Sequence, residues 1–217
     1  MRVFEKLHAL PLPMRGLVAT LLLLILVGQA QSFPTGIDDR GDNGCVCHGG
    51  SDDTTTISIT GLPDFYNSSE IYNFTLSIDS PVSESQNLNE ARGGFRVIIS
   101  HGEIFSYGWM IIEGGYTHNE SINSQRSWQA TWLAPSDDSK LATFIIHGNA
   151  VNGNGESSGD EWNSLAIAIP GANYTGEVIT PILAEDNENY SSSDLFYIIG
   201  GLSIISLIVI IYLVSKD

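Results

Sequence analysis

Residues 41–50, GDNGCVCHGG, contain both cysteines of the chain, Cys45 and Cys47, with His48 directly after them. Two thiols and an imidazole this close together can attach a haem, bind a transition metal or form a disulfide next to a histidine. Which of these chemistries applies depends on the side of a membrane on which the segment lies and on the fold that follows it.

Haem c attachment is the first candidate. Its usual pattern is C-x-x-C-H, whereas a single residue separates Cys45 from Cys47 here, and this changes where the first thiol points. Cys47 keeps its place beside His48, so we expect at least one thioether through Cys47 and an axial bond through His48. A second axial ligand would come from one of four side chains, or that position would stay open: His101, His118, His147 or Met110.

A mononuclear copper or zinc site is the second candidate. Cys45, Cys47 and His48 supply three ligands, and a distant histidine such as His147 would complete a tetrahedron. Zinc sites usually place two or more residues between their cysteines, so the C-x-C spacing fits weakly. An iron–sulfur cluster held by four cysteines is excluded because the chain has two cysteines.

A disulfide between Cys45 and Cys47 is the third candidate. Cysteines of exported domains usually pair, because the cell exterior is oxidising. A bridge between residues two apart closes a very small ring, which strains the preferred dihedral angle, and the surrounding glycines would help the chain to tolerate it. The residues alone leave these three alternatives open, together with a fourth, in which the cysteines stay free thiols or pair with another chain.

A second group of polar side chains lies in the loop 149–160, NAVNGNGESSGD. Ca²⁺ prefers six to eight oxygen ligands, and five amide or carboxylate side chains surround the glycines of this loop: Asn149, Asn152, Asn154, Glu156 and Asp160. The loop lacks the EF-hand spacing. It predicts either a weak calcium site or a polar turn between strands whose glycines adopt positive φ.

The two ends of the chain differ from the middle. The segment 1–32 has basic residues ahead of an apolar run at 17–27 and small residues after it, which is typical of a cleaved signal peptide. Residues 195–214 are twenty residues without a charge, long enough for one transmembrane helix, and Lys216 follows them. We therefore expect a single-pass membrane protein whose body lies outside the cell.

The net charge of −16 excludes a basic nucleic-acid-binding surface. Five N-x-S/T sequons all fall in the exported part, and each is a candidate glycosylation site: Asn67, Asn73, Asn119, Asn173 and Asn189. The sequence has no Ser-His-Asp order, nucleophile elbow or H-E-x-x-H motif, so we expect no enzymatic activity.

The middle of the chain alternates apolar and polar residues over short segments that end at Gly, Asn, Asp or Pro. This pattern predicts seven strands and an all-β fold, an antiparallel β-sandwich, with strands at 54–60, 71–78, 94–100, 105–113, 127–133, 142–148 and 165–169. Its core would contain the aromatic residues Trp109, Trp128, Trp132 and Phe144.

These patterns give a domain organisation in six parts. A signal peptide (1–32) is followed by a Gly/Asp-rich lead-in (33–53) that holds the cysteine motif, and then by the sandwich (54–170). A polar stalk (171–194), the transmembrane helix (195–214) and a cytoplasmic tail (215–217) complete the chain.

Several motifs resemble one known group of domains. In order they are Thr35-Gly36 ahead of the cysteine motif, T-G-L-P at 60–63, G-G-F-R at 93–96, W-x-x-x-W-x-A-P at 128–135 and H-G-N-A-V-N-G-N-G-E-S-S-G-D at 147–160. This order resembles the Reeler-like extracellular domains of prokaryotic anchored surface proteins, related in fold to the N-terminal domain of reelin. The resemblance covers roughly residues 35–170. It implies an immunoglobulin-like β-sandwich at a cell surface, and no settled activity.

In prokaryotic members of this group the leading motif usually reads C-x-x-C-H, and the C-x-C-H of this chain departs from it. We expect a non-catalytic, membrane-anchored surface module for recognition, adhesion or structural support, with an extracellular protein or glycan as partner. Two alternatives are an electron-transfer protein with haem or metal at Cys45, Cys47 and His48, and a calcium-assisted carbohydrate- or protein-binding domain.

Overall fold

The computed structural model of the chain describes residues 35–48, 51–183, 199–201 and 203. Contacts divide the chain into two compact units, Gln31–Asp186 and a second unit of Met1–Ala30 with Asn187–Asp217. The predicted signal peptide lies outside the described residues, and so does the predicted transmembrane segment except for 199–201 and 203, which are helical. In the part that the structure describes, no helix is long and apolar enough to cross a membrane.

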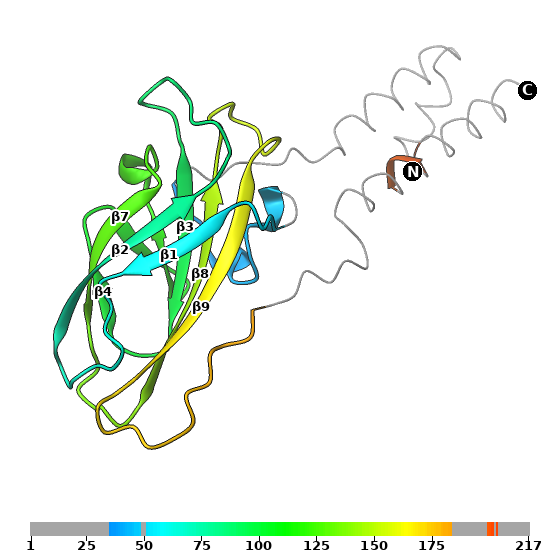
Figure 1. The fold of residues 1–217 in the computed structure, drawn as a ribbon. Coiled ribbons are helices and arrows are strands. Elements are labelled where there is room, and N and C mark those ends of the chain that lie inside the picture. The colour runs from blue at the N-terminus through cyan, green and yellow to red at the C-terminus, as the bar shows by residue number, and fades with distance from the viewer. Residues whose placement is uncertain (1–34, 49–50, 184–198, 202, 204–217) are drawn as a thin grey trace, which may run out of the picture. The chain divides into compact units, whose positions relative to one another are not determined.

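The described residues form nine strands in two antiparallel sheets (Figure 1). One sheet has the order β1-β2-β7-β4 and the other the order β5-β6-β3-β8-β9. This confirms an all-β, antiparallel two-sheet fold. The strands are β1 (Thr56–Thr60), β2 (Ile71–Asp79), β3 (Gly93–Ile99), β4 (Glu103–Phe105), β5 (Trp109–Ile112), β6 (Gly115–His118), β7 (Ser127–Leu133), β8 (Leu141–Ala150) and β9 (Glu161–Pro170).

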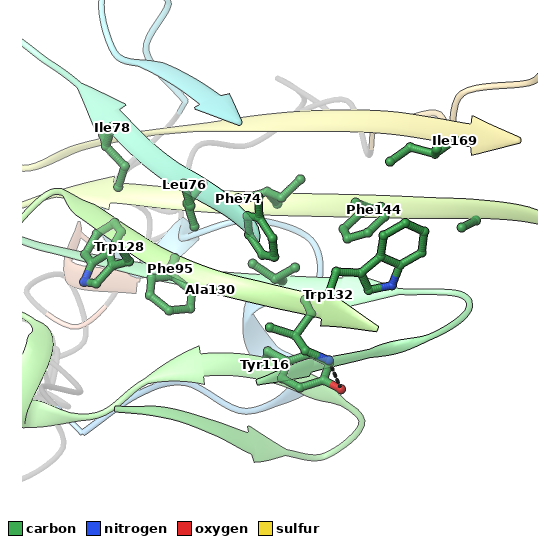
Figure 2. Close-up of a cluster of buried hydrophobic side chains, with 14 of the residues drawn as sticks. Phe74, Leu76, Ile78, Phe95, Tyr116, Trp128, Ala130, Trp132, Phe144 and Ile169 are labelled. Carbon is green, nitrogen blue, oxygen red and sulfur yellow. Dashed lines mark hydrogen bonds between the residues drawn. The ribbon is translucent and has the colours of Figure 1, made fainter. Parts of the chain in front are cut away.

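The core lies between the two sheets and is rich in aromatic side chains (Figure 2). Trp132 is fully buried, with its ring centroid 5.4 Å from Tyr66 and 5.2 Å from Phe144. Trp128 is also buried, as predicted, whereas Trp109 is partly buried and packs against the edge of the core. Edge-to-face ring contacts of this kind add to the free energy gained from apolar burial.

The predicted strand at 105–113 is wrong in one respect, because the structure divides it between the two sheets. β4 ends at Phe105, Gly108 has a φ of 76° in the connection, and β5 begins at Trp109. A hairpin turn at Glu113 and Gly114, both with positive φ, then leads into β6, which the periodicity did not predict. A single run of apolar residues does not show a change of sheet, so periodicity alone could not find this break.

Backbone pairing of the sandwich extends beyond the predicted limits of 54 and 170. The amides of Gly171 and Ala172 donate to the carbonyls of Lys140 (2.9 Å) and Tyr66 (2.8 Å). At the other end, Ser51 forms a bridge with Trp162 of β9. The lead-in contains two short 3-10 turns, η1 (Asp39–Gly41) and η2 (Val46–His48), and a third, η3 (Glu120–Ile122), precedes β7.

Candidate functional site

A row of polar side chains crosses the face of the five-stranded sheet that points away from the core. Thr117 of β6 is paired with Arg96 of β3, Arg96 with His147 of β8, and His147 with Ser164 of β9. We call Thr117, Arg96, His147 and Ser164 the polar row. Side chains on an outer face usually contact water, but Thr117 and Arg96 are 0% exposed and His147 is 2% exposed.

The lead-in covers the polar row, and we call residues 35–48 of it the strap. The strap runs from β6, where the Ile37 amide donates to the Thr117 hydroxyl (3.2 Å), to β9, where Gly44 packs against the ring of Trp162. A Cβ atom added to Gly44 would lie 2.2 Å from a ring carbon of Trp162, and Gly44 has a φ of 114°. Only glycine fits there without displacing the strap or the ring.

Arg96 is the central contact between strap and sheet. Its Nε donates to Oδ1 of Asp42 (2.7 Å), and its Nη1 donates to the carbonyls of Ile112 (2.7 Å) and Ile37 (3.2 Å). Its Nη2 donates to the carbonyl of Glu113 (3.2 Å). A buried guanidinium without partners would be very costly, so these four hydrogen bonds explain why the charge is tolerated and why the strap lies where it does.

His147 is the second anchor of the strap. Its Nε2 lies 3.0 Å from the carbonyl oxygen of Asp42 and its Nδ1 lies 2.6 Å from Oγ of Ser164. Because a carbonyl can only accept, Nε2 carries the proton, and Nδ1 accepts from the Ser164 hydroxyl. Burial lowers the pKa of His147. Both ring nitrogens are therefore engaged, which leaves neither to bind a metal.

The two cysteines lie in different surroundings. Cys45 is buried at 8% exposure and Cys47 is exposed, and both are free thiols in this structure. Burial raises the pKa of the Cys45 thiol to about 12, and the neighbouring Cys47 adds to this effect. The bridge predicted as one alternative is not formed in this structure.

His48 and Asp160, the residue just before β9, form the third contact between the strap and the sandwich. His48 Nδ1 donates to Oδ2 of Asp160 over 2.8 Å, and the two side chains are 15% and 2% exposed. Oδ1 of Asp160 accepts from the backbone amide of Asn152 (3.0 Å). A buried carboxylate that fixes Nδ1 leaves Nε2 as the atom that could bind a metal, which is the arrangement common around metal-bound histidines.

The predicted metal ligands are not brought together. Among the described residues, the only group of three His, Cys, Asp or Glu side chains with ligand atoms within 4.8 Å of one another is Asp38, Asp39 and Glu113. Asp38 is also paired with Arg40 at 2.6 Å, which holds the pKa of Asp38 at about 2. Cys45, Cys47, His48 and His147 therefore do not form a closed tetrahedral site in this conformation.

Haem c fits the motif only in part. His48 would be the ligand to the haem iron and the exposed Cys47 would be the point of attachment, but Cys45 is buried, so the usual pair of thioethers does not fit. The predicted second ligands are placed elsewhere or engaged. His118 is buried beside Phe95, His101 contacts Ser100, and Met110 lies on β5.

In the loop predicted to hold calcium, the side-chain oxygens of Asn152, Asn154 and Asp160 form hydrogen bonds within the chain, whereas the buried Oδ1 of Asn149 has no hydrogen-bond partner among the described residues. Oδ1 of Asn152 accepts from the amide of Asn154 (2.9 Å), and Oδ1 of Asn154 accepts from the amide of Glu156 (2.7 Å). Asp160 is held by His48 and Asn152, and Asn149 is buried in β8 opposite Trp162. These are the contacts of a polar turn, and the calcium site stays a prediction.

Three predicted glycosylation sites are exposed: Asn67, Asn73 and Asn173. Asn119 is half-buried, and its side chain accepts from the amide of Ser121 (2.9 Å) as the N-cap of η3. Asn189 lies outside the described residues. The exposed sites are sterically compatible with modification, which itself stays a prediction.

Sequence reasoning missed most of the residues that hold the strap: Thr117, Arg96, Asp42, Ser164 and Trp162. Thr117, Arg96, Ser164 and Trp162 lie on strands, where a sequence pattern gives no sign that a further segment covers them, and Asp42 lies in the lead-in, which has no periodicity. The only available signal is the composition of the lead-in, whose glycines permit close approach to a sheet. Which face it would cover could not be read from that composition.

Some solved structures are similar to this chain. No family model and no curated protein matches the chain. It is similar to the Reelin-N domain of F-spondin, with 20% identity, 56% of this chain and 88% of that chain covered, and a TM-score of 0.36. The human F-spondin reeler domain (fragment 1) gives 18% identity, 56% and 90% coverage and a TM-score of 0.36.

A conjugative transposon lipoprotein from Bacteroides eggerthii gives 10% identity, 53% and 97% coverage and a TM-score of 0.33. Similarity at this level transfers no activity to this chain. Reeler domains, which the sequence motifs resemble, are thus among the solved structures to which this chain is similar.

Proposed function

We propose that the chain is a membrane-anchored module of the cell exterior whose sandwich acts in recognition, adhesion or structural support. The signal-like segment 1–32, the apolar segment 195–214 and the acidic body support this location. The buried polar residues of the outer face support a non-catalytic role, because Arg96, His147 and Asp160 all contribute to holding the strap.

The observation that carries the proposal is a set of three exposed apolar side chains in residues 105–111, which run from β4 to β5, and each of these strands forms one edge of its sheet. Phe105, Tyr107 and Ile111 are 52%, 81% and 67% exposed, and all lie within seven residues of one another in the chain. Grouped apolar side chains on a surface mark sites of interaction. We name these three residues the β4–β5 edge group and assign partner contact to them.

The test compares proteoliposomes that carry the full chain with proteoliposomes that carry a variant in which the β4–β5 edge group is changed to serine. Binding to cells of the source species should fall about tenfold or more, because buried anchors contribute most of the binding free energy. Leu88→Ser is the matched control, since Leu88 is 73% exposed in the loop between β2 and β3. Equal binding by both variants and the wild type would contradict the proposal.

Location is tested separately from contact. Protease added to intact cells should cleave the sandwich unit from the membrane, and a cytoplasmic control protein should survive. If the protease cleaves the sandwich unit only after the cells are permeabilised, the unit lies inside the cell, and a surface function has no basis.

Electron transfer is a second candidate, and the His48–Asp160 contact favours it because it engages Nδ1 and leaves Nε2 as the ring nitrogen that would bind iron. Bound haem would supply one-electron chemistry at its iron. Cys47 is the accessible thiol for attachment, and Asp160 would orient the imidazole. Absorption spectra and intact masses of protein from a host that matures haem c test this candidate. It predicts a haem band that is lost in Cys47→Ala and kept in Cys45→Ala, whereas a colourless wild-type protein would contradict it.

A further inference from the structure

The shape of the turn at η2 keeps the two thiols apart. The His48 amide donates to the Cys45 carbonyl over 2.8 Å, which closes a 3-10 turn around Cys45, Cys47 and His48. A 3-10 turn has about three residues, so side chains two positions apart point in directions that differ by roughly 120°. One thiol therefore faces the protein while the other faces water, as their burial shows.

Both sides of Cys45 are fixed to the sheet. Gly44 before it packs against Trp162, and His48 after it donates to the buried carboxylate of Asp160. Trp162 is 3% exposed. For Cys45 to leave its buried position and turn toward Cys47, residues 44–48 must come away from the sheet.

We propose that formation of a Cys45–Cys47 disulfide is coupled to release of residues 44–48 from the sheet, so that the dithiol form holds the strap and the disulfide form uncovers Trp162. The strap is then a redox-sensitive element. This inference does not rest on the proposed surface function.

The chemistry is thiol–disulfide exchange with an external small-molecule disulfide. The Cys47 thiolate attacks one sulfur of that disulfide, a mixed disulfide forms, and the other half leaves as a thiolate. Once released, Cys45 gives its proton to solvent, and its thiolate attacks the Cys47 sulfur and expels the second half. The two cysteine thiols are oxidised, and the external disulfide is reduced to two thiols.

The second step is slow while the strap is held. Cys45 is buried, and its raised pKa keeps it as a thiol, which is not the attacking species. The mixed disulfide at Cys47 therefore accumulates first, and the internal bridge follows at the rate at which residues 44–48 open.

The experiment uses the full chain in detergent with oxidised glutathione as the probe. Samples are quenched with acid, and intact mass and peptide mapping follow the mixed disulfide and the bridge over time. Trp162 emission, defined by subtracting the spectrum of Trp162→Phe, follows release of the strap. The wild type should show the mixed disulfide on Cys47 first, with the later bridge and the change in emission appearing together.

Asp160→Asn removes the charge that holds His48, and it should speed formation of the bridge about tenfold or more, as expected for loss of a charged hydrogen bond. Tyr66→Phe is the matched control, because it removes hydrogen bonds to the carbonyls of Asp137 and Lys140 and leaves the strap contacts intact. Cys45→Ser can form the mixed disulfide alone, and its Trp162 emission should not change.

Three results would overturn the proposal. One is a wild-type bridge that forms as fast as in the urea-unfolded chain. Another is a bridged protein whose Trp162 emission equals that of the reduced protein. The third is equal acceleration by Tyr66→Phe and Asp160→Asn, which would show that the bridge follows global unfolding. If Asp160→Asn does not fold, the proposal is tested by two wild-type measurements, the rate of bridge formation and the Trp162 emission.

Discussion

The substitution Gly44→Ala tests how closely the strap fits the sheet. Gly44 has a φ of 114°, and an added Cβ would lie 2.2 Å and 2.4 Å from two ring carbons of Trp162. The ring cannot retreat easily, because Trp162 is 3% exposed and lies in β9. Alanine at this position should therefore lift the strap away from the polar row.

Two effects contribute to the expected loss of the free energy of unfolding in Gly44→Ala. An alanine at positive φ costs about 1–2 kcal/mol. Lifting the strap also weakens the contacts of Asp42 with Arg96 and His147, and because the Asp42 side chain is 38% exposed and screened by water, we count this charged hydrogen bond at about 1.5 kcal/mol, the lower end of its usual range. We expect the free energy of unfolding to fall by about 3 kcal/mol in Gly44→Ala.

The control Gly114→Ala separates the backbone cost of alanine at positive φ from the loss of the strap contacts. Gly114 has a φ of 80° in the β5–β6 turn, and an added Cβ there meets nothing within 4 Å. Urea denaturation should show that the free energy of unfolding falls by about 1–2 kcal/mol in Gly114→Ala and by clearly more in Gly44→Ala. Alkylation of Cys45 should become faster in Gly44→Ala and stay unchanged in Gly114→Ala. Equal losses and unchanged alkylation would refute the close fit of strap and ring.

Three further predictions concern titration, a buried charge and calcium. Lowering the pH from 6.5 toward 4 should reduce the free energy of unfolding by about 3 kcal/mol, because burial lowers the pKa of His118 to about 4 and the unfolded chain binds the proton more readily. The contribution of neutral His118 to the free energy of unfolding is present above pH 6.5 and is lost as the pH falls toward 4. Urea denaturation across this range should show the loss in the wild type and a smaller loss in His118→Gln, and an equal fall of the free energy of unfolding with pH in both proteins would contradict this prediction. Arg96→Lys should cost about 3 kcal/mol, since an ammonium cannot replace the guanidinium fork toward Asp42 and the three carbonyls; a melting temperature like that of the wild type would refute its role. Calcium should leave the melting temperature unchanged, because the Asn152 and Asn154 side-chain oxygens already accept backbone amides; a rise with calcium that Asp160→Asn abolishes would instead establish the calcium site.

The sandwich could be predicted because its strands alternate between a core and an exterior. β2 places Phe74, Leu76 and Ile78 in the core, and β7 has the limits that its alternation indicates. The alternation of apolar and polar residues reflects whether each side chain faces the core or water, so it predicts the strands that pack on the core. It could not show that the segment 105–113 changes sheet, because Phe105 and Trp109 satisfy the pattern equally well in either sheet.

The candidate site was less predictable because it depends on contacts between distant parts of the chain. Cys45, Cys47 and His48 were recognised from their spacing, and Asp160 was identified for a different chemistry. The hydrogen bond between His48 and Asp160 joins residues 112 positions apart, so it is absent from any local pattern. Arg96 could not be recognised as buried until the position of the strap was known.

Alkylation of the two thiols in the folded protein tests most directly that the Cys-x-Cys-His segment is held against the sheet by the strap contacts. Purified full chain is treated with N-ethylmaleimide with and without urea, and the labelled positions are mapped by mass. The structure predicts fast labelling of Cys47 alone in the folded protein and labelling of both cysteines in urea. Equal labelling of Cys45 and Cys47 without urea, or a protein that accepts no label until it is reduced, would contradict it.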